Sequence, residues 1–158
     1  MQIEVKVGAL IMDPNSSTPI VVLKGIDSEA ILPIWIGAYE ANAIALEIEK
    51  VVPQRPMTHD LIRNLILELG YHAEKVIVSD LRENTFYASI ELASEDGDNK
   101  VTMDARPSDA IALALRVDCP IFVEQNVLDI SSTTQSQPAE DLAEEEIPVP
   151  DDWPDVIG

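Results

Sequence analysis

The sequence predicts an α+β fold in which a β-β-β-α unit is duplicated, with an extra helix between the two copies, all within one compact single domain. The first observation is internal similarity, because Ala43-Ile44-Ala45-Leu46 recurs as Ala110-Ile111-Ala112-Leu113. Short apolar stretches upstream of these segments match at the same spacing, which places the copies at about residues 3–50 and 70–117. The second observation is composition, since a chain of 158 residues that is 46% hydrophobic can form one domain with its own core.

Three strands are predicted in the first copy, over residues 3–12, 19–24 and 30–36. Apolar and polar residues alternate there, and turn-forming residues separate the stretches. Pro33 indicates that the third strand lies at an edge or contains a bulge, since proline cannot donate a hydrogen bond to a neighbouring strand. A helix is predicted over residues 40–51, where apolar residues share one face and small alanines allow close packing.

The segment between the copies predicts a second helix. Thr58 has a hydroxyl that can cap this helix, Asp60 falls in its first turn, and Gly70 marks its end. Apolar residues keep a helical period over residues 61–69.

The second copy follows the same plan and is extended by one strand. Ser108 is expected to cap its helix. We assign residues 1–130 to the folded domain. Residues 131–158 are rich in Pro, Asp and Glu and contain no Lys or Arg, so they predict a disordered acidic C-terminal tail. The predicted elements of the second copy are strands over 74–79, 85–93 and 100–105, a helix over 108–117 and a strand over 120–124.

Charge limits the functions that the chain can have. The formal net charge is −19 at pH 7, and such a surface repels nucleic acid and anionic membranes. A phosphate site must therefore be a local pocket of arginines, helix N-termini or a metal ion. No apolar stretch approaches the roughly 18 residues of a membrane-spanning helix, and Cys119 is the only cysteine. We expect a cytoplasmic protein without membrane contact, in which Cys119 is a packing residue.

Two predicted helix starts share one order of residues: arginine, proline, a hydroxyl side chain and a carboxylate. They are Arg55-Pro56-Met57-Thr58-His59-Asp60 and Arg106-Pro107-Ser108-Asp109. The residue before a proline is extended, a hydroxyl can cap the helix, and the free N–H groups of the first turn attract anions. An arginine beside them offers a planar fork that matches phosphate. The predicted phosphate-binding residues are Arg55, Thr58, Arg106 and Ser108.

Acid–base and metal-binding groups lie in or beside the same motifs. A helix N-terminus disfavours the imidazolium, so His59 would be a neutral general base near pH 7. Asp104 stands at the end of a predicted strand, where ligand sites often form, and Glu40 is a further candidate carboxylate. Carboxylate oxygens could hold one or two Mg²⁺ or Mn²⁺ ions. The predicted catalytic residues are His59, Asp60, Asp104 and Asp109, and the predicted metal ligands are Asp60, Asp104 and Asp109.

Plainer explanations of the two motifs stay open. Arg-Pro-Ser-Asp can simply start a helix, with the aspartate facing the helix dipole and the arginine paired with the aspartate. A single histidine such as His59 can equally be a packed structural residue. Motifs of several other enzyme classes are missing from the sequence, which contains no Gly-rich phosphate loop, no His-Glu-x-x-His and no Gly-x-Ser-x-Gly.

At these motifs the sequence resembles the bifunctional nuclease (BFN, DUF151) family, over roughly residues 3–130. The resemblance implies DNase and RNase activity, a compact duplicated α+β domain and association into homo-oligomers. It places functional roles on Arg55, His59 and Asp60 in one motif, and on Asp104, Arg106, Ser108 and Asp109 in the other. The stretches that carry it are residues 32–37 with Glu40-Ala41, residues 55–61, residues 104–114 and Pro120-Ile121.

These observations are compatible with two functions. The first is metal-assisted hydrolysis of phosphodiester bonds in DNA, RNA or both, with weak and salt-sensitive substrate binding because of the acidic surface. The second is a non-catalytic oligomeric module that binds a small anion or a partner protein. The acidic surface and the scarcity of Trp and Phe for stacking bases favour the second.

Overall fold

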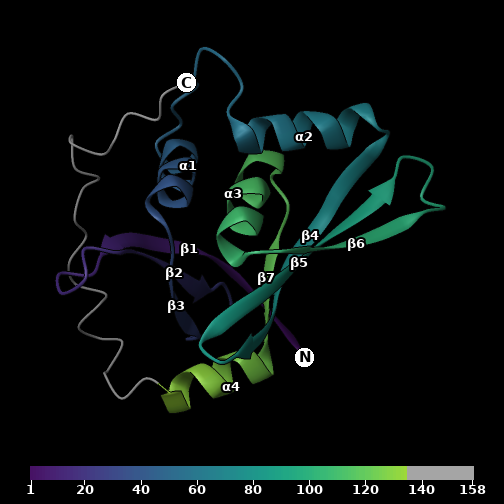
Figure 1. Cartoon of the computed structure of the whole chain (residues 1–158). Coiled ribbons are helices and arrows are strands. Elements are labelled where there is room, and N and C mark those ends of the chain that lie inside the picture. The colour runs from purple at the N-terminus through teal and green to yellow at the C-terminus, as the bar shows by residue number, and fades with distance from the viewer. Residues whose placement is uncertain (135–158) are drawn as a thin grey trace.

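The protein, here a computed structural model that describes residues 1–134, is an α+β domain in which helices pack on one mixed sheet (Figure 1). The fold class predicted from the sequence is confirmed. Within the described residues the strands are β1 (Gln2–Met12), β2 (Pro19–Gly25), β3 (Ile31–Trp35), β4 (Tyr71–Arg82), β5 (Thr85–Ser94), β6 (Lys100–Ala105) and β7 (Ile121–Glu124), and the helices are α1 (Ala38–Ile48), α2 (Thr58–Glu68), α3 (Pro107–Val117) and α4 (Gln125–Thr134).

The described strands form one sheet in the order β3-β2-β1-β7-β4-β5-β6. Neighbours are antiparallel except β4 and β7, which run parallel. Each half of the sheet is a three-stranded meander, and β7 joins the halves by pairing with β1 on one side and β4 on the other. The order strand-strand-strand-helix therefore occurs twice with α2 in between, while an origin by duplication stays a prediction.

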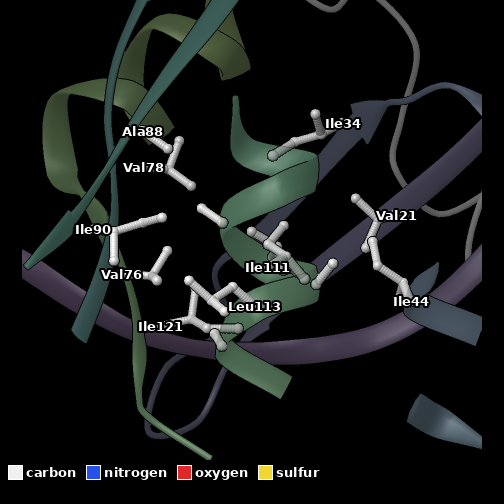
Figure 2. Packing of buried hydrophobic residues seen from close by; sticks show 14 of the residues in the cluster. Val21, Ile34, Ile44, Val76, Val78, Ala88, Ile90, Ile111, Leu113 and Ile121 are labelled. Carbon is white, nitrogen blue, oxygen red and sulfur yellow. The ribbon is translucent and has the colours of Figure 1, made fainter. Parts of the chain in front are cut away.

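Helix α3 packs between the two halves of the sheet. Ile111 and Leu113 of α3 are buried, with Val76 and Ile90 of the β4–β5 half on one side and Val21 of β2 on the other (Figure 2). Burying one large apolar side chain of this kind contributes about 1.5–3 kcal/mol. The core therefore fixes α3, and with it the second Arg-Pro motif, relative to both halves.

The sequence of α3 explains how closely its neighbours approach. Ala110, Ala112 and Ala114 are all buried, and their small side chains allow α1 and α2 to pack against α3. Pro107 occupies the first helical position, where a missing N–H is harmless. Asp118 ends the helix in the left-handed region, at φ 59°.

The two predicted hydroxyl caps are wrong. Neither α2 nor α3 has a side-chain cap hydrogen bond. Thr58 is the first residue of α2 and does not cap it. The Asp60 carboxylate stabilises this helix start in place of the Thr58 hydroxyl, because its Oδ2 accepts a hydrogen bond from the Met57 N–H at 2.9 Å. Ser108 lies inside α3, because Pro107 takes the position that begins the helix.

Pro33 lies in an edge strand, β3, as the chemistry of proline predicted.

The C-terminal boundary of the folded part differs from the prediction. Helix α4 continues to Thr134, beyond the point at which the acidic tail was predicted to begin. The rest of the predicted tail, residues 135–158, lies outside the described residues. Among the helices of residues 1–134, none is both long and apolar enough to cross a membrane.

Candidate functional site

The two Arg-Pro motifs meet through a histidine and an aspartate. His59, in the first turn of α2, places its Nε2 2.9 Å from Oδ1 of Asp109, in the first turn of α3. His59 is buried, whereas about a third of the Asp109 side chain is exposed. An imidazole held against a carboxylate is an arrangement that can share and transfer a proton.

Arg106 holds the other oxygen of the same carboxylate. Its Nε and Nη2 each lie 2.9 Å from Asp109 Oδ2, and Nη2 lies 2.7 Å from Glu40 Oε1 in α1. Asp109, and secondarily Glu40, raise the pKa of Arg106 above its usual value, so the guanidinium stays charged. Glu40, Arg106, Asp109 and His59 thus form one continuous chain of contacts, which we call the helix-start network.

Gly37 allows Glu40 to take its place in this network. Gly37 is the N-cap of α1, and a Cβ at this position would lie 2.3 Å from Glu40 Oε2. Any larger residue would therefore displace the carboxylate that contacts Arg106. Glycine is needed at this position because of the close approach of Glu40, since the φ of −78° at Gly37 is open to other residues.

Asp60 takes part in a separate, buried ion pair with Arg116 of α3. Arg116 Nε donates to Asp60 Oδ1 at 2.9 Å, and Arg116 Nη1 donates to the Ala112 carbonyl at 2.9 Å. Glu47 of α1 lies 4.0 Å from the same Nε. Because the other Asp60 oxygen accepts the N–H of Met57, both of its oxygens have protein donors. The pair ties α2 to α3.

Arg116 was not predicted. The sequence did contain a signal, because an arginine inside the apolar run from Ile111 to Val117 must find a carboxylate if that helix is buried. Which carboxylate it finds depends on the packing of α2 against α3, and no local pattern gives that.

The remaining predicted residues are not part of the network. Arg55 is exposed before α2, and Asp104 is exposed in β6, where its backbone pairs with Ser89. Neither has an ion pair with any residue of the described chain. Thr58 is exposed at the start of α2, while Ser108 is buried and lines a cavity beside Arg106.

The donor set does not fit the predicted metal site. Asp60 and Asp109 each use both oxygens in contacts with protein donors, and Asp104 lies apart from them in β6. In residues 1–134 no group of three or more His, Cys, Asp or Glu side chains is arranged to hold a metal ion.

Cys119 lies outside this site. Burial raises the pKa of its thiol to about 11, so little thiolate forms near neutral pH. A packing role suits this environment.

The fold and the network define a class: an α+β domain in which the first turns of three helices bring a guanidinium, two carboxylates and an imidazole into contact. The model of the bifunctional nuclease domain matches residues 21–136, and the chain belongs to this family.

Relatives of the chain include proteins with and without a named activity. An uncharacterized protein of Mycobacterium tuberculosis is 46% identical over 125 residues, which cover 79% of this chain and 73% of the relative. Bifunctional nuclease 2 of Oryza sativa subsp. japonica is 28% identical over 79% of this chain and 39% of its own length. Bifunctional nuclease 2 of Arabidopsis thaliana is 28% identical over 77% and 40%. The chain thus spans well under half of these plant relatives.

Proposed function

We propose that the protein hydrolyses phosphodiester bonds of DNA, RNA or both, with the helix-start network as its active site. The observation that carries the proposal is the unbroken contact from Glu40 through Arg106 and Asp109 to His59, which unites a phosphate-binding group with an acid–base pair. The family and the names of the plant relatives support a nucleic-acid substrate.

Arg106 is the group that would bind the phosphate. Its Nε and Nη2 contact carboxylates, and its Nη1 has no hydrogen-bond partner among the described residues. The two carboxylates therefore orient the guanidinium while leaving one of its nitrogens for the substrate. A guanidinium that is oriented before the reaction stabilises the negative charge that develops on the phosphate oxygens.

The His59–Asp109 pair would accept the proton of the attacking water. An ionised carboxylate only accepts hydrogen bonds, so Nε2 of His59 carries the hydrogen of its contact with Asp109. Nδ1 is then the ring nitrogen that would take the proton from the water and later give it to the leaving oxygen. We propose His59 as the general acid–base group and Asp109 as the carboxylate that orients the imidazole and stabilises its charged form.

Three further expectations stay predictions. The phosphate-binding role of Arg55 and the catalytic role of Asp104 stay predictions, and both residues are exposed outside the network. A requirement for Mg²⁺ or Mn²⁺ is expected from the sequence, but its predicted ligands Asp60, Asp104 and Asp109 are not grouped to hold an ion within residues 1–134, so the cleavage assay includes EDTA. A cytoplasmic location is also expected.

The test is a cleavage assay on the full chain purified from a nuclease-deficient host. Labelled single-stranded DNA and RNA are incubated with Mg²⁺, with Mn²⁺ and with EDTA. We expect cleavage by the wild-type protein and a fall of about 10²–10⁴-fold in His59→Gln, which is the usual contribution of a general acid–base group.

Asp27→Asn serves as the control, since Asp27 is exposed in the loop between β2 and β3, away from the network. Equal activity in wild type and His59→Gln would indicate a contaminating nuclease. Retention of oligonucleotide without cleavage under every condition would instead support the non-catalytic anion-binding module.

A further inference from the structure

We infer that the cavity beside Arg106 binds one nucleotide unit, with the base against Trp35 and the phosphate at the start of α3. This inference rests on the proposed nuclease function, because it names the part of the substrate that enters the site. The cavity has a volume of about 380 Å³, near the lower end of the roughly 300–1,000 Å³ of small-molecule sites. This volume is enough for a single nucleotide.

Four parts of the fold close around the cavity. They are the end of β3, the N-terminus of α1, the turn between β4 and β5, and the N-terminus of α3. The lining includes two aromatic residues, Trp35 and Phe86, and two polar residues at the start of α3, Arg106 and Ser108.

Ser108 marks the phosphate end of the cavity. The residue is 6% exposed, and its hydroxyl has no hydrogen-bond partner within the described part of the chain. Its oxygen is open to the cavity rather than sealed in the core, so a ligand oxygen there can exchange a hydrogen bond with it in place of water. Because Ser108 is in the first turn of α3, unpaired backbone N–H groups lie beside it and favour an anion.

The charge of the lining is opposite to that of the whole chain. Of the residues in 1–134 that line the cavity, Arg106 is the only charged one. Glu40 and Asp109 contact the same guanidinium but do not line the cavity. An anion that enters therefore meets a cation and a helix N-terminus, although the formal net charge of the protein is −19.

Trp35 and Phe86 mark the base end. The indole Nε1 of Trp35 donates to Asp13 Oδ2 at 3.1 Å, which fixes the ring, and 44% of the residue remains exposed. Phe86 follows a tight turn in which Glu83 and Asn84 both have positive φ, as in two-residue hairpins. Two aromatic rings on rigid supports cannot line a long single-strand groove, but they suffice for one base.

The substrate class follows from this shape. A base can enter the cavity only when it is unstacked and unpaired, as at a strand end or in a single strand. We therefore assign the site to single-stranded DNA or RNA, with one nucleotide held in the cavity and its phosphate beside the helix-start network.

Binding is tested without cleavage, by calorimetry on the full chain with AMP, adenosine and inorganic phosphate as separate probes. We expect AMP to bind at least about 10-fold more tightly than adenosine or inorganic phosphate, because AMP can contact both ends of the cavity. A single-stranded oligonucleotide should compete with AMP, and the duplex of the same sequence should not.

Ser108→Ala is the decisive variant. Its hydroxyl makes no internal hydrogen bond, so the thermal stability should be unchanged or higher while the AMP affinity falls about 10-fold. Ser131→Ala, which alters another buried serine in α4, is the matched control. Trp35→Leu should weaken AMP about 10-fold and phosphate hardly at all, with the exposed Tyr39→Ala on α1 as its control.

The outcomes separate this inference from the proposed function. Cleavage of single strands together with wild-type AMP affinity in Ser108→Ala would overturn the nucleotide pocket and leave the nuclease proposal standing. AMP binding that is lost in Ser108→Ala, without any cleavage, would support the pocket and remove the hydrolytic function. Equal competition by the duplex would also overturn the pocket.

Discussion

Nε2 of His59 and Oδ1 of Asp109 lie 2.9 Å apart, although the two residues belong to different helices and different motifs. Their contact joins the two Arg-Pro helix starts into one site. The same aspartate also accepts two contacts from Arg106, so a change at Asp109 affects the imidazole and the guanidinium together.

Asp109→Asn should abolish most of the activity while the fold persists. The substitution removes the charge that orients both His59 and Arg106, so we expect kcat to fall by at least about 100-fold. Circular dichroism and the melting temperature should stay near those of the wild type, since Asp109 is partly exposed. Activity above a tenth of the wild-type value would remove Asp109 from the reaction.

Gly37→Ala should impair activity through Glu40. The added methyl group would occupy the position 2.3 Å from Glu40 Oε2, so the carboxylate must move away from Arg106. The backbone at Gly37, with φ −78°, is open to alanine, so little stability should be lost. We expect Glu40→Gln and Gly37→Ala to lower kcat by similar factors and not to add in the double variant. Additive effects would contradict a shared cause.

The Asp60–Arg116 pair should contribute more to the free energy of unfolding than to activity. Asp60→Ala leaves the buried Arg116 with Glu47, 4.0 Å away, as its remaining carboxylate contact, and breaking a buried pair costs about 3–5 kcal/mol. Replacement of both residues by leucine should cost less than Asp60→Ala, because no charge is left unpaired. Urea denaturation measures both values. An Asp60→Ala protein of wild-type stability but without activity would assign Asp60 to the chemistry instead.

Cys119 should make the fold sensitive to alkaline pH. Its pKa is raised from 9.0 to about 11 by burial, so the folded state retains the thiol proton more strongly than the unfolded state. This contribution is complete below about pH 9 and is lost as the pH rises toward 11. Cys119→Ala should therefore flatten the decline of the melting temperature over this range. An unchanged decline would indicate other titrating groups.

The homo-oligomer implied by the family resemblance has a candidate contact face on α2. Leu61, Leu65 and Leu69 share one side of this segment and are 62%, 56% and 67% exposed. Such an apolar stripe typically marks an association surface. Leu61→Gln with Leu65→Gln should lower the mass measured by light scattering, whereas Leu67→Gln, on another side of the helix, should not. A wild-type protein that is monomeric at micromolar concentration would contradict the prediction.

The plan of the fold could be predicted from local patterns. Alternation and helical periodicity correctly placed three strands and a helix in each half, and Pro33 correctly indicated an edge. The central place of β7 could not be predicted, because its pairing with β1 and β4 joins residues distant in sequence. The prediction of hydroxyl caps was wrong for two reasons. The Asp60 carboxylate accepts the Met57 N–H at the start of α2, and Pro107 takes the position that begins α3.

The sequence indicated individual residues of the candidate site but not the contacts between them. The sequence indicated His59, Arg106 and Asp109 as candidates, and Glu40 as a further carboxylate. Their grouping into one chain depends on the small alanines that let α1 and α2 pack on α3, and this is a property of the assembled core. Arg116 was missed for the same reason, since its partner lies on another helix.

The position of β7 also governs how the chain must reach its native state. Two meanders can form early, but each keeps an open hydrogen-bonding edge until residues 121–124 insert between them. Open edges of this kind invite pairing with other chains. During synthesis the sheet stays incomplete until this late segment leaves the ribosome, so we expect premature termination upstream of Ile121 to give an aggregation-prone product rather than a smaller working domain.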